Sequence, residues 1–135
     1  MKKKISLALL VILSAFMLVA CGKQMTDAEK FVGTWVAPPN QCPDLPETDV
    51  INWGEKMVVF SDGTVYDMCF LASDPDTIAA EFYWDSYTME NGYLKYKTKN
   101  VATGVPVDGV LNYQYVNDDT LKMGGETLTF YYRQK

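Results

Sequence analysis

Short runs of alternating apolar and polar residues dominate the chain from Phe31 to Arg133. The period of the pattern is two, and the runs are rich in aromatic and β-branched residues, which is typical of strands. Turn residues separate the runs, and Asn91-Gly92 is the strongest short hairpin signal among them. We expect eight strands, over residues 31–37, 56–60, 64–71, 79–89, 93–99, 109–116, 120–123 and 126–133.

Alternation within these strands separates an apolar face from a polar one. In the strand at 93–99, Leu94 and Tyr96 share one side and three lysines lie on the other. A similar division recurs in the three strands that follow, which indicates an antiparallel sheet wrapped around an interior. Because no helix is expected to cover a sheet edge, we predict an all-β fold: an antiparallel meander of about eight strands closed into a small barrel.

The interior of this barrel is the first candidate for a functional site. The side chains assigned to it are aromatic, and several carry hydroxyl groups that need partners when buried. An eight-stranded barrel is just wide enough to be filled by side chains or to hold one small ligand, so two interpretations are open, a filled core and a pocket for a small apolar molecule. The residues concerned are Phe60, Trp84, Tyr96, Tyr113, Tyr115, Phe130 and Tyr132.

One segment, 38–55, breaks the alternation. It contains four of the six prolines, and a loop of this length inside a compact domain is uncommon and often functional. It is either a rigid surface meander or a functional loop, and its apolar residues Val50, Ile51 and Trp53 indicate that it packs over another part of the domain.

The first 20 residues form a separate unit. Three lysines precede an apolar run from Ile5 to Ala20, which is too short to span a bilayer as a helix and fits an export signal. Leu18-Val19-Ala20-Cys21 resembles the lipobox of bacterial lipoproteins. The resemblance implies removal of residues 1–20 and acylation of Cys21; an ordinary signal peptide or an uncleaved anchor is the alternative.

The remaining chain divides into a lipidated cysteine with a short tether, 21–30, and one barrel domain, 31–135. In the tether, Thr26 and Glu29 have the spacing of a capping box, which predicts one helical turn.

Charge restricts the possible partners. Three of the 12 Lys and Arg residues lie in the signal, so nine remain against 17 Asp and Glu, and the mature formal charge is about −8. Such a chain lacks the excess of positive charge that binding to nucleic acid requires, and anionic lipids would repel it. The expected link to the membrane is therefore the acylated Cys21. Gly22 differs from the aspartate that retains lipoproteins at an inner membrane, so we expect the outer membrane of a two-membrane host, or the outer face of the plasma membrane of a one-membrane host.

Signals of catalysis are nearly absent. The chain has no histidine, which excludes a Ser-His-Asp arrangement and a histidine metal site, and it has no glycine-rich phosphate-binding motif. Asp74 and Asp76, and likewise Asp118 and Asp119, lack the spacing of a known calcium loop. We expect no enzymatic activity, no cofactor and no metal.

Cys42 and Cys69 remain once Cys21 is acylated. In an exported protein two cysteines are expected to form one disulfide, and two free thiols are the alternative. The bridge would bring the middle of the 38–55 segment against the third strand.

The first expected strand begins with Phe31-Val32-Gly33-Thr34-Trp35. A Gly-x-Trp sequence at this position, followed by about eight antiparallel strands, resembles the lipocalin superfamily, especially the lipocalin-like domains of small bacterial lipoproteins. The Asp62-Gly63-Thr64 turn and Arg133 add to the resemblance. It implies that Trp35, preceded by Gly33, plugs one end of the barrel and that Arg133 packs across it. Alternation alone points Arg133 outward, so the side chain would have to curl around the strand end.

Two functions are therefore expected. The first is a lipid-anchored, lipocalin-like barrel that binds a small apolar or amphipathic molecule at the cell envelope. The alternative is an anchored protein-interaction module, such as an inhibitor or an envelope-assembly accessory, with a filled barrel and no ligand.

Overall fold

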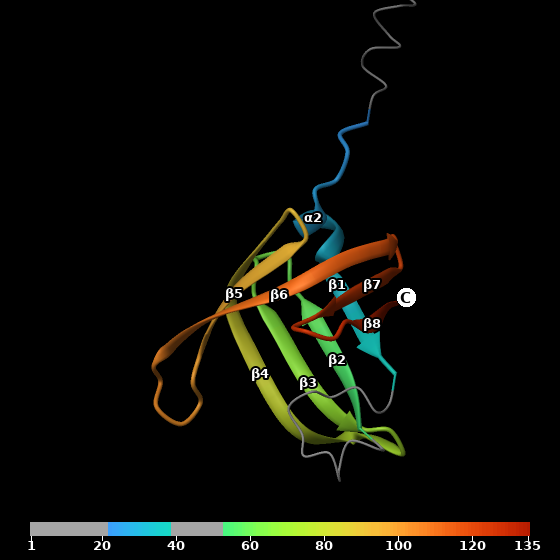
Figure 1. Ribbon diagram of the computed structural model, residues 1–135. Coiled ribbons are helices and arrows are strands. Elements are labelled where there is room, and N and C mark those ends of the chain that lie inside the picture. Colours follow the sequence, from blue (N-terminus) through green and yellow to red (C-terminus); the bar gives the residue numbers. More distant parts are fainter. Residues whose placement is uncertain (1–21, 39–52) are drawn as a thin grey trace, which may run out of the picture.

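The chain folds into a closed β-barrel. In the computed structural model, which describes residues 22–38 and 53–135, eight strands run antiparallel to their neighbours in chain order (Figure 1). The last strand pairs with the first, with Arg133 opposite Trp35. The predicted all-β meander and its closure are confirmed. The expected signal peptide, Cys21 and Cys42 lie outside the described residues.

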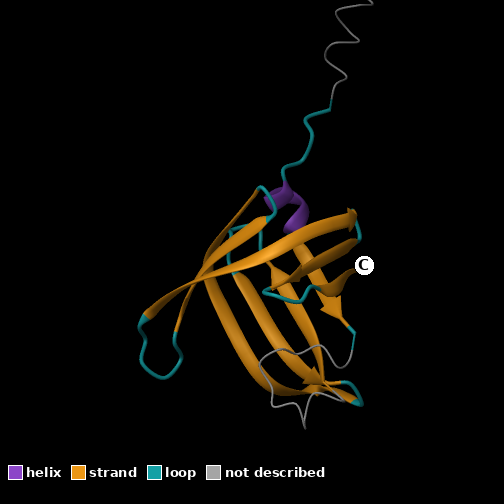
Figure 2. Cartoon of the chain, in the orientation of Figure 1, coloured by secondary structure: helices purple, strands orange, loops and turns teal. Residues whose placement is uncertain are grey.

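Within the described residues, one short helix precedes the strands, and tight turns connect several of the strands (Figure 2). Asn91 and Gly92 both have positive φ, 53° and 80°, as a two-residue hairpin loop requires. The elements are α2 (Asp27–Phe31), β1 (Gly33–Ala37), β2 (Trp53–Val59), β3 (Val65–Leu71), β4 (Asp74–Glu90), β5 (Tyr93–Lys99), β6 (Pro106–Asn117), β7 (Thr120–Gly124) and β8 (Thr129–Gln134).

The strands lie close to their predicted positions, and β5 matches its prediction at both ends. Three strands begin earlier than expected because backbone pairing continues beyond the apolar runs. β2 begins at Trp53, inside the segment expected to be a loop, since Trp53 pairs with Leu71. β4 begins at Asp74 and β6 at Pro106. β1 is shorter than expected, because Phe31 belongs to α2.

The capping box predicted before α2 is present. Thr26 Oγ1 accepts a hydrogen bond from the Glu29 amide at 3.2 Å, and the Glu29 carboxylate accepts one from the Thr26 amide at 2.8 Å. Phe31, the last residue of α2, is fully buried against Trp35 and Tyr87. The helix therefore covers one end of the barrel, and the preceding chain leaves the domain there (Figure 1). Within the described part of the chain, no helix has the length and apolar character needed to cross a membrane.

The side chains of β5, β6 and β7 follow the predicted alternation. Leu94, Leu121 and Met123 are buried, whereas Lys95 and Lys97 are exposed. The buried core consists of Phe31, Trp35, Ala37, Met57, Val59, Val65, Trp84, Leu94, Tyr113, Leu121, Met123 and Tyr131.

The face predicted for β8 is wrong. Phe130 and Tyr132 point outward, 38% and 47% exposed, whereas Tyr131 is buried. Directly opposed residues of an antiparallel pair share a face, and Tyr131 lies opposite the buried Leu121 of β7. Three consecutive aromatic residues occupy this strand, so alternation alone could not choose between the two faces.

Phe60 also lies outside the interior, with 46% of its surface exposed. β2 ends at Val59, and the backbone of Phe60 is hydrogen-bonded across the turn to Thr64 and Gly63. Phe60 therefore belongs to the hairpin turn between β2 and β3, and not to the inward face of β2.

Candidate functional site

One end of the barrel is closed by Trp35, whose side chain is fully buried. The indole Nε1 donates a hydrogen bond to the Phe31 carbonyl at 2.8 Å, which ties the ring to the end of α2. The Arg133 guanidinium lies 4.3 Å from the centroid of the indole, well within the range of a cation–π interaction. This is the contact that the lipocalin resemblance implies.

Arg133 reaches Trp35 along the inner face of β8, so the expectation that alternation points it outward is wrong. The two residues are directly opposed in the β1–β8 pair and therefore share a face. Gly33 makes room for the arginine, since a Cβ atom there would lie only 2.7 Å from Arg133 Nη1. Gly33 also has a φ of +134°, which residues with a side chain rarely adopt. Gly33 and Trp35 therefore both lie against the same side chain of the last strand, Arg133.

The same guanidinium holds three backbone carbonyl groups. Nη1 donates to Val32 at 2.9 Å, Nη2 donates to Lys30, and Nε donates to Asp118 at 3.1 Å. Lys30 and Val32 lie at the C-terminal end of α2, where carbonyl groups lack partners within the helix. The Asp119 carboxylate lies 3.5 Å from Nε. Arg133 therefore joins α2 to β8 and to the turn between β6 and β7.

Three tyrosine hydroxyls also hold α2. Tyr113 donates to the Asp27 carboxylate at 2.6 Å, Tyr115 to the Asp27 carbonyl at 2.9 Å, and Tyr87 to the Ala28 carbonyl at 3.3 Å. Burial and the hydrogen bond to Asp27 raise the pKa of Tyr113 to about 12. Burial also raises the pKa of Tyr87 and of Tyr115. Tyr113 and Tyr115, predicted to line a pocket, instead close the α2 end of the barrel.

The protein should lose stability in alkaline solution as these hydroxyls ionise. The ordinary pKa of tyrosine is about 10. Because the pKa of Tyr113 is raised to about 12 in the folded state, its contribution to stability is complete below the ordinary value and is lost as the pH rises through about 12. Urea unfolding over this range measures the loss, and Tyr113→Phe should make it shallower because phenylalanine does not ionise.

The matched control for this prediction is Tyr93→Phe, because Tyr93 is an exposed tyrosine on β5. It should leave the alkaline profile unchanged. A Tyr113→Phe profile that runs parallel to that of the unmodified protein would contradict the prediction.

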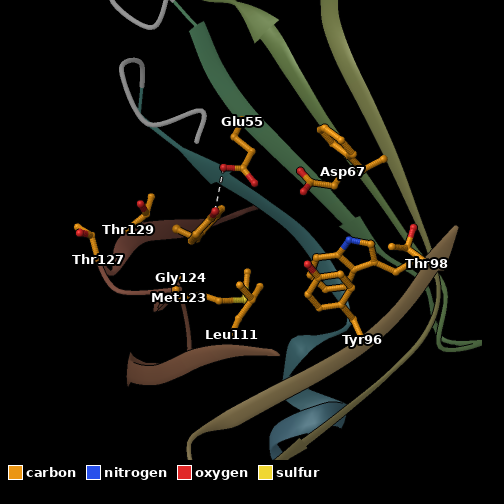
Figure 3. Close-up of a pocket in the computed structure, with 13 residues that line it drawn as sticks. Glu55, Asp67, Tyr96, Thr98, Leu111, Met123, Gly124, Thr127 and Thr129 are labelled. Atoms are coloured by element: carbon orange, nitrogen blue, oxygen red, sulfur yellow. Dashed lines mark hydrogen bonds between the residues drawn. The ribbon is translucent and has the colours of Figure 1, made fainter. Parts of the chain in front are cut away.

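The opposite half of the barrel contains a cavity of about 330 Å³. Its described lining comes from β2 to β8 and from the turn between β7 and β8 (Figure 3). Gly125 and Thr127 in this turn are exposed, whereas Glu55, Trp84 and Tyr131 are buried, so the cavity runs from the surface into the interior. The lining residues are Glu55, Asp67, Phe82, Trp84, Tyr96, Thr98, Leu111, Met123, Gly124, Gly125, Thr127, Thr129 and Tyr131.

The described lining of this cavity includes two carboxylate side chains, those of Glu55 on β2 and Asp67 on β3 (Figure 3). Glu55 is only 4% exposed and accepts a hydrogen bond from the Tyr131 hydroxyl at 2.8 Å. Glu55 pairs with Cys69, two residues from Asp67 on the same face, so the two carboxylates are diagonal neighbours on adjacent strands. No Lys or Arg is among the described residues that line the cavity.

A stacked aromatic pair forms a second wall of the cavity. The rings of Trp84 and Tyr96 lie 4.5 Å apart and 18° from parallel. Gly109 lies opposite Tyr96 on β6, and a Cβ atom there would overlap the Tyr96 ring, so this glycine allows the ring to lie where it does. Phe82, opposite Asp67 on β4, adds a third ring.

Of the seven aromatic residues predicted to line a pocket, Trp84 and Tyr96 line this cavity. The sequence pattern does not predict Glu55, Asp67 or Tyr131 as lining residues. Asp67 had a signal, because it is a charged residue on the otherwise apolar face of its strand. Glu55 gives no such signal, because it lies in the segment expected to be a loop. Tyr131 lies on the face of β8 that alternation predicts to be polar.

The acidic pairs considered as calcium ligands take part in local contacts. The Asp74 carboxylate accepts a hydrogen bond from the Thr77 hydroxyl at 2.7 Å. The Asp119 carboxylate forms ion pairs with Arg133 and Lys135. Within residues 22–38 and 53–135, no three Cys, Asp or Glu residues gather as a possible metal-binding group.

Cys69 is buried on β3 and is disulfide-bonded. It lies opposite Glu55, at the end of the barrel that holds the cavity. Because Cys42 lies outside the described residues, its pairing with Cys69 stays a prediction.

Comparison with known proteins identifies no relative. The chain matches no family model, no curated protein and no solved structure. Any function assigned to it therefore rests on its sequence and on the geometry of the barrel.

Proposed function

We propose that the protein is an exported lipoprotein, anchored by acyl chains on Cys21, whose lipocalin-like barrel binds one small apolar or amphipathic molecule at the cell envelope. The observation that carries the binding function is the cavity of about 330 Å³. This volume falls at the lower end of the range for small-molecule sites. A barrel filled by its own side chains would not contain such a space.

The anchor is supported by the lipobox-like sequence and by the path of the described tether. Residues 22–26 are exposed and leave the barrel at the α2 end (Figure 1). The cavity is in the other half of the barrel, so with the membrane at the α2 end it would open toward molecules dissolved in the envelope. The proposed location is the outer membrane of a two-membrane host, or the outer face of the plasma membrane of a one-membrane host.

A second candidate is an anchored protein-interaction module, such as an inhibitor or an envelope-assembly accessory. The outer face of β8 favours it, because Phe130 and Tyr132 are exposed there with ring centroids 6.4 Å apart. Exposed aromatic side chains are typical anchors of protein interfaces. Neither candidate includes a catalytic step, a cofactor or a nucleic-acid partner.

Native mass spectrometry of the protein, gently extracted from its own host, tests the proposal. The expected mass is that of a chain beginning at an acylated Cys21, with one additional small molecule that is lost on denaturation. Cys21→Ala is the control, and it should retain the signal and lack the acyl mass. A mature chain with an unmodified Cys21 would overturn the anchor, and a barrel without additional mass would favour the interaction module.

A further inference from the structure

The cavity is lined by acidic side chains, which is unusual for a site that binds an apolar molecule. Its described lining contains two carboxylates, Glu55 and Asp67, and no basic side chain. Charged groups that line a binding site are usually matched by groups of opposite charge on the bound partner. An anionic ligand would add a further negative charge beside these groups, and a purely apolar ligand would place hydrocarbon against them. A positively charged group is the ligand chemistry that complements them.

The aromatic walls fit the same chemistry. A cation is attracted to the face of an aromatic ring within about 6 Å of its centre, and tryptophan is the most effective ring. Trp84 and Tyr96 are stacked along one wall, and Phe82 lies directly opposite Asp67 in the β3–β4 pair. The site therefore offers rings beside a carboxylate, so one ammonium group could contact both.

The remainder of the lining suits the rest of such a molecule. Leu111 and Met123 provide apolar contacts, and the hydroxyls of Thr127 and Thr129 provide hydrogen-bonding groups beside the exposed turn between β7 and β8 (Figure 3). A cavity of about 330 Å³ is at the small end of the range for ligand sites. The space therefore favours a compact molecule over a long acyl chain.

We infer that the ligand of this barrel is a small organic cation, with an ammonium group held by Glu55 and Asp67 and an apolar, ring-sized body packed against Trp84 and Tyr96. The inference rests on the proposed function and narrows its ligand from any small apolar or amphipathic molecule to one charge class. Glu55 and Asp67 are then specificity-determining residues, and Tyr131, which donates to Glu55, is a positioning residue.

Calorimetric titration of the mature protein in phosphatidylcholine nanodiscs tests the inference, with empty nanodiscs as the blank. The probes are 2-phenylethylamine, 2-phenylethanol and 3-phenylpropionate, which share a phenyl group on a short chain and differ in charge. At neutral pH the amine should bind at least about tenfold more tightly than the alcohol, because a hydrogen bond to a charged group contributes more than a neutral one. The propionate should bind more weakly than the alcohol.

Matched variants locate the effect. Glu55→Gln and Asp67→Asn should each lower the affinity for the amine by about tenfold and leave the affinity for the alcohol nearly unchanged. Glu126→Gln is the control, because Glu126 is an exposed carboxylate in the turn between β7 and β8 that does not line the cavity. It removes the same charge near the same opening and should change neither affinity. Should one cavity variant fail to fold, the comparison of the three probes on the unmodified protein still decides.

Equal affinity for the amine and the alcohol would overturn the charge class and leave the proposed binding function standing. Binding of none of the three probes would also overturn the inference, while the mass spectrum described above decides separately whether the barrel holds a different molecule. A further outcome is that CaCl₂ displaces the amine from the unmodified protein but not from either cavity variant. The site would then bind a metal ion and not an organic cation, and the inference would again be overturned.

Discussion

Replacing Trp35 with alanine should lower the free energy of unfolding by about 3–5 kcal/mol, the usual cost of removing a large buried aromatic side chain. The indole is fully buried and lies against Phe31 and Tyr115. Its removal would leave a cavity at the closed end of the barrel, free the Phe31 carbonyl from its hydrogen bond, and take the ring from beneath the Arg133 guanidinium. Urea unfolding followed by circular dichroism measures the change.

The control for this substitution is Tyr93→Ala, which removes an aromatic side chain that is exposed on the outer face of β5. A surface substitution of this kind should change the free energy of unfolding by no more than about 0.5 kcal/mol. If Trp35→Ala does not fold, Trp35→Phe can be measured in its place. This variant retains a ring and loses mainly the indole hydrogen bond, so the free energy of unfolding should fall by about 1 kcal/mol. A Trp35→Ala loss as small as that of Tyr93→Ala would mean that the barrel end does not depend on this residue.

The strands whose two faces differ clearly could be predicted from the sequence. In β5, lysines occupy every second position between Leu94 and Lys99, and a row of ammonium groups cannot be buried. The interior face of that strand therefore follows from local chemistry alone. The capping box at Thr26 and Glu29 is local in the same way, since both of its hydrogen bonds lie within one turn.

The orientation of β8 could not be predicted, because it depends on its neighbours. Phe130, Tyr131 and Tyr132 suit either face by their own chemistry. Only the pairing of Tyr131 with Leu121, and of Arg133 with Trp35, determines which of them point inward. A shift of one residue would exchange the two faces, and a pattern in one strand does not contain that information.

The cavity could be predicted even less, because its polar residues contradict the rule that apolar residues face inward. Glu55 lies in a proline-rich segment without alternation, and Asp67 is a charge on an apolar face. The two come together only through the register of β2 against β3. Departures from the local pattern are expected at functional sites, where residues are selected for ligand binding as well as for stability.

Replacing Arg133 with methionine should lower the free energy of unfolding by about 2–4 kcal/mol, although methionine retains much of the apolar length of arginine. The loss comes from the carbonyl groups of Lys30, Val32 and Asp118, which the guanidinium holds together. Arg133→Lys should recover less than half of it, because a single ammonium group cannot reproduce the planar fork of donors.

Lys135→Met is the matched control for Arg133, since both side chains form an ion pair with Asp119. The Lys135 side chain is 83% exposed, so its ion pair should contribute no more than about 0.5 kcal/mol. Hydrogen exchange provides a second measurement, because the amide of Lys30, which is bonded to the Thr26 carbonyl, should lose protection in Arg133→Met and keep it in Lys135→Met. If Arg133→Lys were as stable as the unmodified protein, the arginine would act through its charge alone. The closed end of the barrel would then not depend on the hydrogen bonds that join α2 to the last strand.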